Sequence, residues 1–144
     1  MKNNRLISRI KIINYLLLKG NKRIAEKKFL ETLKLIQHSS NKDSKNIFKF
    51  AIINKAPFLN IKVKKRKKKI VREIPFIFKS SLRTPYAIKE IIKAARKKKE
   101  SSFPILLRSE IFNSFTVNNE NLKQKNEIYK KSFSKKAFSH FRWF

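Results

Sequence analysis

Residues 59–78 read LNIKVKKRKKKIVREIPFIF, and this stretch decides the fold. In its first part, Leu59, Ile61 and Val63 alternate with polar residues, and near its end an apolar residue again occupies every second position, from 74 to 78. A period of two residues is typical of a β-strand with one apolar face. The sequence therefore predicts a β-hairpin arm over about 58–79, and Pro75 indicates an edge position for its second strand.

Between the two strands lies a run of six basic residues, KKRKKK at 64–69. The run contains no glycine, so we expect a longer loop at the tip rather than a tight two-residue turn. Like charges this close repel one another unless a polyanion lies near them. The run is either a polyanion-binding tip or a solvated charged loop.

Apolar residues at helical spacing lie on both sides of the hairpin and predict about six helices. The stripes are Leu6, Ile10, Ile13 and Leu17; Ala25, Phe29, Leu33 and Ile36; Ile47, Phe48, Ala51 and Ile52; Ile88, Ile91, Ile92 and Ala95; Leu107, Ile111 and Phe115; and Leu122, Tyr129 and Phe133. We therefore predict a mainly α fold in a single domain over residues 1–144, with the projecting basic hairpin between the third and fourth helices.

Capping residues and prolines suggest where these helices begin and end. Gly20 closes the first helix, Asp43 or Ser44 starts the third, Thr84-Pro85 starts the fourth, Ser102 with Pro104 starts the fifth, and the last runs from about Leu122 to near Ala137. Pro57 stops the third helix before the hairpin.

The chain carries 38 Lys and Arg against nine Asp and Glu, for a formal net charge of +29. Solubility alone needs a net charge of only about 2–8, so this excess favours a polyanionic partner. Nucleic acid is the commonest such partner, since each neutralised phosphate releases counterions. The hydrophobic fraction of 41% predicts a folded core beneath the basic surface rather than a disordered tail.

Enzymatic chemistry finds little support in this composition. There is no cysteine and only one glycine, which excludes thiolate metal sites and a glycine-rich phosphate loop. The acids are scattered singly, and His38 and His140 stand alone. We expect no catalytic residue, metal or cofactor, although an RNA-processing enzyme stays open as a further class. No apolar run approaches the roughly 18 residues of a membrane span, and the acid-free first 25 residues are either a transit peptide or the first helix.

The last ten residues, KKAFSHFRWF, interleave cations with aromatic rings. Aromatic rings can stack on exposed bases, and Lys and Arg can pair with phosphates. Alternatively, Phe138, Phe141 and Trp143 anchor this end of the chain to the protein. We assign the cations Lys135, Lys136 and Arg142 to RNA binding in either case.

Four features of the sequence match one family pattern, and they follow one another along the chain as they do in that family. They are KAFSHFRW at 136–143, GNKRIAE at 20–26, AARK at 94–97, and the spacing of Pro75 and Arg83 from that last motif. Together they resemble the small-subunit ribosomal protein seven family of bacterial and organellar ribosomes. The order of helices, hairpin and helices also agrees, so the resemblance covers nearly the whole chain.

The resemblance implies a structural protein that binds the 3′ major domain of small-subunit rRNA and organises the head of the subunit. It also implies a place near the exit-site tRNA and the mRNA exit, beside head and platform proteins, rather than a membrane protein or a free homo-oligomer. The RNA-binding residues carried over are Lys22, Arg23, Lys62, Lys64, Lys65, Arg66, Lys67, Lys68, Lys69, Arg72, Arg83, Arg96 and Lys97.

Two departures from the family pattern affect these expectations. Lys68 and Lys69 stand where the family has a Gly-Gly pair at the arm tip, and the basic segment before the first helix is nearly absent. Lys, Asn, Ile and Phe, which A and T alone can encode, are abundant. The divergence and this bias favour a mitochondrial ribosome over a plastid one. The alternative function is an architectural DNA-binding protein of an organellar nucleoid.

Overall fold

The computed structural model describes residues 10–40, 43–65, 71–116 and 119–143. Within them the chain forms seven helices, the last of which is a 3-10 helix, and one two-stranded antiparallel sheet. A first helix covers residues 10–16; it is followed by α2 (Lys22–Ser39), α3 (Ser44–Lys55), β1 (Leu59–Lys65), β2 (Val71–Ile77), α4 (Ser80–Lys97), α5 (Phe103–Phe115), α6 (Asn119–Ser134) and the 3-10 helix η1 (Lys136–Trp143). The prediction of a mainly α fold with a hairpin between the third and fourth helices is confirmed.

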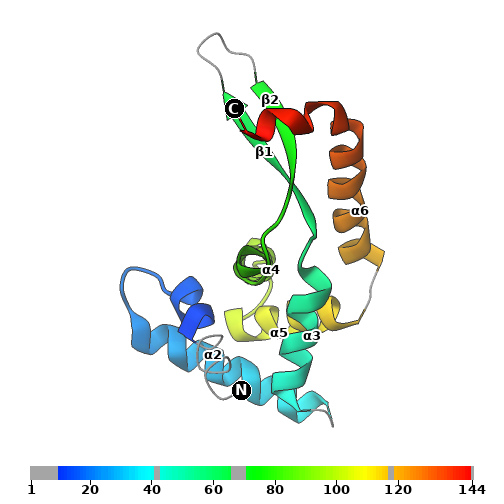
Figure 1. Cartoon of the computed structure of the whole chain (residues 1–144). Coiled ribbons are helices and arrows are strands. Elements are labelled where there is room, and N and C mark those ends of the chain that lie inside the picture. The colour runs from blue at the N-terminus through cyan, green and yellow to red at the C-terminus, as the bar shows by residue number, and fades with distance from the viewer. Residues whose placement is uncertain (1–9, 41–42, 66–70, 117–118, 144) are drawn as a thin grey trace.

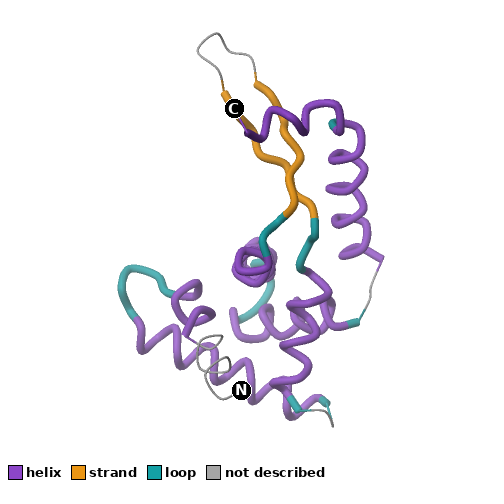
Figure 2. Tube along the Cα trace, in the orientation of Figure 1, coloured by secondary structure: helices purple, strands orange, loops and turns teal. Residues whose placement is uncertain are grey.

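The elements gather into two parts, which Figures 1 and 2 show at opposite ends of the view. We call the first helix together with α2, α3, α4 and α5 the helical base. We call β1, β2, α6 and η1 the arm assembly. In the base, α5 packs against α2, α3 and α4, whereas in the arm assembly α6 and η1 pack along the hairpin.

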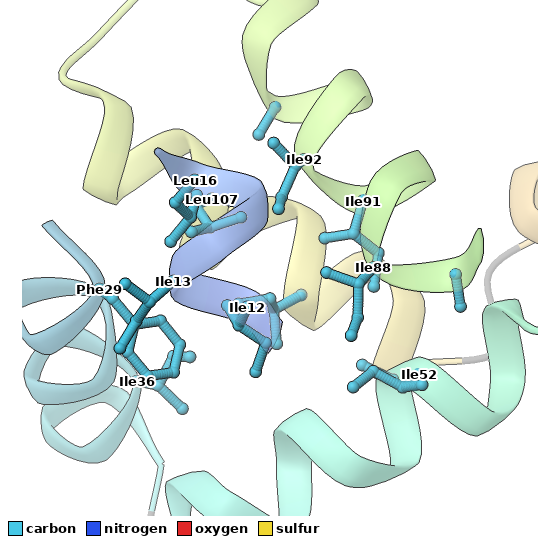
Figure 3. Close-up of a cluster of buried hydrophobic side chains, with 14 of the residues drawn as sticks. Ile12, Ile13, Leu16, Phe29, Ile36, Ile52, Ile88, Ile91, Ile92 and Leu107 are labelled. Carbon is cyan, nitrogen blue, oxygen red and sulfur yellow. The ribbon is translucent and has the colours of Figure 1, made fainter. Parts of the chain in front are cut away.

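The core of the helical base consists almost entirely of aliphatic side chains (Figure 3). Its most deeply buried large residues include Ile36, Ile47, Ile88, Leu107 and Ile111, one or more from each of α2 to α5. Phe29 of α2 adds an edge-to-face contact with Phe48 of α3 at 6.1 Å between ring centroids. The second to fifth predicted stripes therefore meet in one core.

The third helix begins and ends where its sequence predicts. The Asp43 carboxylate accepts a hydrogen bond from the Lys45 backbone N–H at 3.3 Å, which satisfies one free donor at the helix start. The helix ends at Lys55, just before Pro57. This boundary matters because it sets the point at which the chain leaves the base and enters β1.

The hairpin register separates two faces of the arm. Lys64 lies opposite Arg72 and Lys62 opposite Ile74, so these four side chains share one face. Ile74 on that face is 3% exposed because η1 packs against β2 there. The other face carries the apolar stripe of β1, where Val63 is 52% exposed. The two apolar stripes predicted from the sequence thus lie on opposite faces.

The buried stripe of the first helix differs from the prediction. Ile12, Ile13 and Leu16 are buried, whereas Ile10 is half-exposed; Leu6 lies outside the described residues. The base reaches this helix from both α2 and α4, so two adjacent stripes are needed (Figure 3). Gly20 has the expected positive φ of 78°, but it lies in the turn before α2 rather than directly after the helix.

The predicted start of the fourth helix at Thr84-Pro85 is wrong. The helix begins at Ser80, and Pro85 lies inside it. The fixed φ of proline suits a helix, and near the helix start it removes only one backbone hydrogen bond. Contacts to the hairpin stabilise the earlier turn, because Arg83 Nε donates to the Phe78 carbonyl at 2.9 Å.

The last helix is also shifted relative to the prediction. It covers Asn119–Ser134, and Phe133, predicted to share one side of the helix with Tyr129, is 69% exposed. The face turned to the hairpin contains Tyr129, a member of the predicted stripe, whose hydroxyl accepts a hydrogen bond from the Phe58 backbone N–H, together with Ser132, which is 3% exposed. The side chain of Leu122 lies outside the described set, and the chain continues from the helix into η1.

Candidate nucleic-acid interface

The arm brings several predicted cations onto one face. Lys62 is exposed, and Lys64 and Arg72, which lie opposite each other in the register, are half-buried. The backbone of Lys65 continues the strand toward the tip. Arg66, Lys67, Lys68 and Lys69 lie outside the described residues. The described part of the arm therefore presents a short cationic strip that leads toward the predicted basic tip.

The C-terminal segment packs against this strip. The Arg72 guanidinium lies over the Phe141 ring at 4.7 Å, and Lys64 Nζ donates to the Phe141 carbonyl at 3.4 Å. Phe141 is half-buried and His140 is exposed, with 4.0 Å between their ring centroids. Phe141 thus anchors the tail to the arm. This agrees with the second alternative for the tail aromatics, in which they attach this end of the chain to the protein. Phe138 is still 39% exposed.

The cations of the tail extend the same region. Lys136 is exposed at the start of η1, and Lys135 immediately before it is half-exposed. Because η1 packs on β2, these two lysines belong to the same part of the molecule as the arm cations. The side chain of Arg142 lies outside the part of the structure that is described.

Arg83 joins the arm to the helical base. Besides its hydrogen bond to the Phe78 carbonyl, its guanidinium lies over the Phe58 ring at 4.5 Å. Phe58 and Phe78 flank the hairpin on its two sides, and the Phe58 carbonyl accepts a hydrogen bond from the Phe78 N–H. The side chain of Arg83 therefore fixes the root of the arm, a role that sequence reasoning missed when it grouped this residue with the RNA contacts.

The remaining predicted cations lie on the helical base. Lys22 and Arg23 are exposed at the start of α2, and Lys22 Nζ lies 4.0 Å from a Glu26 carboxylate oxygen. Arg96 and Lys97 are exposed at the end of α4. Figure 1 shows α2 and the hairpin at opposite ends of the molecule, so the predicted cations form at least two separate groups.

The end of α4 holds a pocket that the sequence did not reveal. An open cavity of about 490 Å³ is lined by Tyr15, Lys89, Ile92, Lys93, Arg96 and Lys97. Of these, only Arg96 and Lys97 were predicted. A signal was available, since Lys89, Lys93, Arg96 and Lys97 recur at helical spacing beside the apolar stripe of the same helix.

Buried or half-buried charges on α3, α4, α5 and α6 interact with one another. Glu110 is 8% exposed and pairs with Lys98 at 2.6 Å. Burial lowers the pKa of Lys55, while Glu110 and then Glu90 oppose that shift. Burial, followed by the charge of Lys55, lowers the pKa of Lys125. Within the described ranges, no three or more His, Cys, Asp or Glu residues are grouped so that they could hold a metal ion.

None of the described helices is both long enough and apolar enough to cross a bilayer.

Comparison with known proteins bears directly on this arrangement. The family model described as ribosomal protein S7p/S5e matches residues 2–136. The chain is 32% identical to small ribosomal subunit protein uS7 of Wigglesworthia glossinidia brevipalpis and 35% identical to uS7c of Euglena gracilis, in each case over 92% of this chain and 85% of the relative. It is 29% identical to uS7 of Oleidesulfovibrio alaskensis over 98% of this chain and 88% of that protein. The chain therefore belongs to the ribosomal protein S7p/S5e family.

Proposed function

We propose that this protein, a structural and non-enzymatic constituent of the small ribosomal subunit, binds small-subunit rRNA through its two cationic groups. The observation that carries the proposal is the family match across residues 2–136. The net charge of +29 favours binding to a polyanion such as rRNA, because a compact chain with this charge repels itself unless a polyanion neutralises it.

On the arm, the exposed cations act as phosphate clamps. Lys62 and Lys136 project from a rigid hairpin and from the helix packed on it, so both lysines approach RNA with restricted motion. Contacts of this kind position RNA without reading its sequence. The predicted tip cations Lys65 to Lys69 extend the clamp in this proposal, and Arg142 adds to it from the tail.

On the base, Lys22 and Arg23 at the start of α2 and Arg96 and Lys97 at the end of α4 form the second contact. Lys64, Arg72 and Arg83 have a double role, since each also contacts the protein itself. The aliphatic core of the helical base keeps α2 and α4, which carry the base cations, at a fixed spacing. A fixed spacing favours a folded RNA of matching shape over a flexible one.

The finer placement follows the family resemblance. We infer that the rRNA contacted is the 3′ major domain and that the protein organises the head, near the exit-site tRNA and the mRNA exit. Its protein neighbours are then those of the head and platform. The lysines at positions 68 and 69 replace a glycine pair, so the contact of the arm tip with tRNA or mRNA is the least supported part of this placement.

We further infer an organellar ribosome, with the mitochondrion as the first choice and the plastid as the second. The support is the abundance of residues that A and T alone can encode. The relative from Euglena gracilis carries a plastid-type name, and this keeps the plastid in consideration. Sedimentation of the native protein from purified organelles tests the choice: migration with small subunits of mitochondria supports it, and migration only with plastid subunits contradicts it.

A two-charge variant tests RNA binding through the arm. Lys62→Gln combined with Lys136→Gln removes two exposed cations without altering Lys64 or Arg72. Each lost phosphate contact lowers the slope of log K against log salt by up to about 0.9. We expect a reduced slope for small-subunit rRNA in a filter-binding titration at several salt concentrations.

The matched control carries Lys45→Gln and Lys49→Gln, two exposed lysines on α3. We expect it to keep the slope of the unchanged protein. Equal slopes for the arm variant and the unchanged protein would mean that the arm lysines face water. A preference for duplex DNA over rRNA at equal salt would support the nucleoid alternative instead.

A further inference from the structure

The pocket between the first helix and α4 combines an aromatic ring, an aliphatic wall and a cationic rim. Tyr15 and Ile92 supply the apolar surface, and four basic side chains of α4 surround it. Ile92 is buried and Tyr15 is half-buried, so both are held by the packing of the first helix against α4 (Figure 3). The four basic side chains, those of Lys89, Lys93, Arg96 and Lys97, are exposed.

Arg96 holds the two walls of this pocket together. Its Nη2 donates to the Tyr15 carbonyl at 3.4 Å and to the Leu16 carbonyl at 3.3 Å. These carbonyls lie at the end of the first helix, where the backbone has no further helical partner. A cation also suits the negative end of that helix. Arg96 is therefore the residue that positions the Tyr15 ring relative to α4.

The cations Lys89, Lys93 and Lys97 are left to act on a ligand. Lys89 Nζ lies 5.1 Å from the centre of the Tyr15 ring, on an exposed side chain that can rotate away. No acidic residue lines the pocket, so a bound anion is not repelled by a negative charge there. The site thus offers a flat apolar surface beside several ammonium groups.

We propose that this pocket binds one unpaired nucleotide of the RNA, with its base against Tyr15 and Ile92 and its phosphate beside Lys93 and Lys97. The inference rests on the proposed function and adds a specific ligand to it. A volume of about 490 Å³ falls in the range typical of pockets for small organic ligands. A base in a continuous duplex cannot enter, because its faces are already covered by neighbouring bases.

A bare phosphate would not need the apolar wall. Stacking of a base on an aromatic ring adds affinity that is independent of salt, whereas the lysines add affinity that salt weakens. The two kinds of contact can therefore be separated by experiment. Substitution of Tyr15 changes affinity at constant salt slope, and substitution of a lysine changes the slope.

The test uses the full chain with two RNA stem-loops that are identical except for one unpaired bulge nucleotide. We expect the unchanged protein to bind the bulged stem about tenfold more tightly, in the range set by single-base stacking. We expect Tyr15→Phe to keep this preference and Tyr15→Leu to lose it. Lys93→Gln should weaken binding to the bulged stem and lower its salt slope by about 0.7.

Thermal melting confirms that each variant is folded, and Lys34→Gln on the exposed side of α2 is the matched control for lost charge. A photocrosslinking base, 4-thiouridine, at the bulge provides a readout that needs no substitution. We expect its crosslinks to fall on residues 15 and 89–97. Crosslinks confined to other segments would overturn the assignment.

The outcomes separate this inference from the proposed function. If the protein binds both stems equally and Tyr15→Leu has no effect, the pocket assignment fails while RNA binding stands. If neither stem nor small-subunit rRNA binds in preference to DNA, the proposed function itself fails. Competition by free adenosine monophosphate at micromolar concentration would instead make the pocket a site for free nucleotides and overturn the assignment to RNA.

Discussion

The helical base and the arm assembly are held together by different kinds of contact. In the base, isoleucines and leucines from the first helix and from α2 to α5 form one buried cluster. Among the described residues of the arm assembly few apolar side chains are buried, and a cation of the hairpin itself holds the tail, with Arg72 over the Phe141 ring; cation–ring contacts such as Lys28 over Phe103 also occur in the base, but at the edge of its aliphatic cluster. The base therefore depends on the burial of apolar surface, whereas the arm assembly depends partly on its own positive charges.

This difference has a consequence for a protein of such high charge. Apolar burial needs no charged partner, so we expect the base to keep its core without RNA wherever salt screens the repulsion between its own cations. The contacts of Lys64 and Arg72 with Phe141 compete with phosphates for the same cations. We expect RNA binding to redistribute contacts in the arm assembly and to leave the base unchanged.

The largest expected effect of a single substitution is in the base. Ile111 is 0% exposed and lies on α5, which packs against three other helices. Ile111→Ala should lower the free energy of unfolding by about 2–5 kcal/mol, the range for loss of a buried isoleucine side chain. Urea denaturation followed by circular dichroism at high salt measures it.

The matched change in the arm is Val63→Ala. Val63 is 52% exposed on the open face of the hairpin, so we expect a change within about 0.5 kcal/mol. Equal losses of unfolding free energy for the two variants would show that the arm belongs to the same cooperative core as the base. The arm and the base would then not differ in how they are stabilised.

The second effect is confined to the arm assembly. Phe141→Leu keeps an apolar side chain but removes the ring beneath Arg72. A cation–π contact of this kind is worth about 0.5–2 kcal/mol, so local opening of η1 should become several-fold more frequent. Hydrogen exchange measured by mass spectrometry should show faster exchange in residues 136–143 and in β2.

The base supplies the internal control for that experiment. Amides of α5 should exchange at the same rate in the variant and in the unchanged protein, since no side chain there touches the tail. Faster exchange throughout both parts would mean that the arm and the base unfold together.

The sequence predicted the elements well and their partners poorly. The alternation at 59–63 and 74–78 gave the hairpin, and the stripes of α2 to α5 gave the core. Periodicity shows that a helix or strand has an apolar face, but it does not show which neighbour covers that face. Val63 belongs to the predicted apolar face of its strand and Phe133 to the predicted stripe of its helix, yet both side chains are exposed.

The candidate site shows the same limit. The family resemblance pointed to Lys62 and the basic, aromatic tail to Lys136, and both side chains are exposed. Neither of these signals distinguished Arg83, which fixes the root of the arm through Phe78 and Phe58. The pocket around Tyr15 was also missed, because residues 15 and 89 become neighbours only when the first helix packs on α4.

A third and smaller effect is expected where the base meets α6. Burial lowers the pKa of Lys55, so the folded state holds this proton less tightly than the unfolded state. Its contribution to stability therefore rises as pH increases from below the folded pKa toward the unfolded value. Lys55→Met should reduce the gain in stability as pH rises toward the ordinary lysine pKa of 10.5, compared at high salt.

Two features make that measurement specific. Lys49→Met on the exposed side of α3 removes the same charge and should keep the gain. Burial raises the pKa of Tyr86, which lowers stability only in the upper part of that pH range, where its ionisation in the unfolded state begins. An identical pH dependence for the two lysine variants would show that burial of Lys55 carries no energetic consequence.

The smallest expected effect tests the orientation of α6. Phe133 is 69% exposed, so Phe133→Ser should change the free energy of unfolding by less than about 0.5 kcal/mol. Tyr129→Phe, four residues earlier, removes the hydroxyl that accepts the Phe58 N–H and should cost about 0.5–1.5 kcal/mol. Urea denaturation of both variants measures the difference. A larger loss for Phe133→Ser than for Tyr129→Phe would mean that Phe133, rather than Tyr129, faces the hairpin.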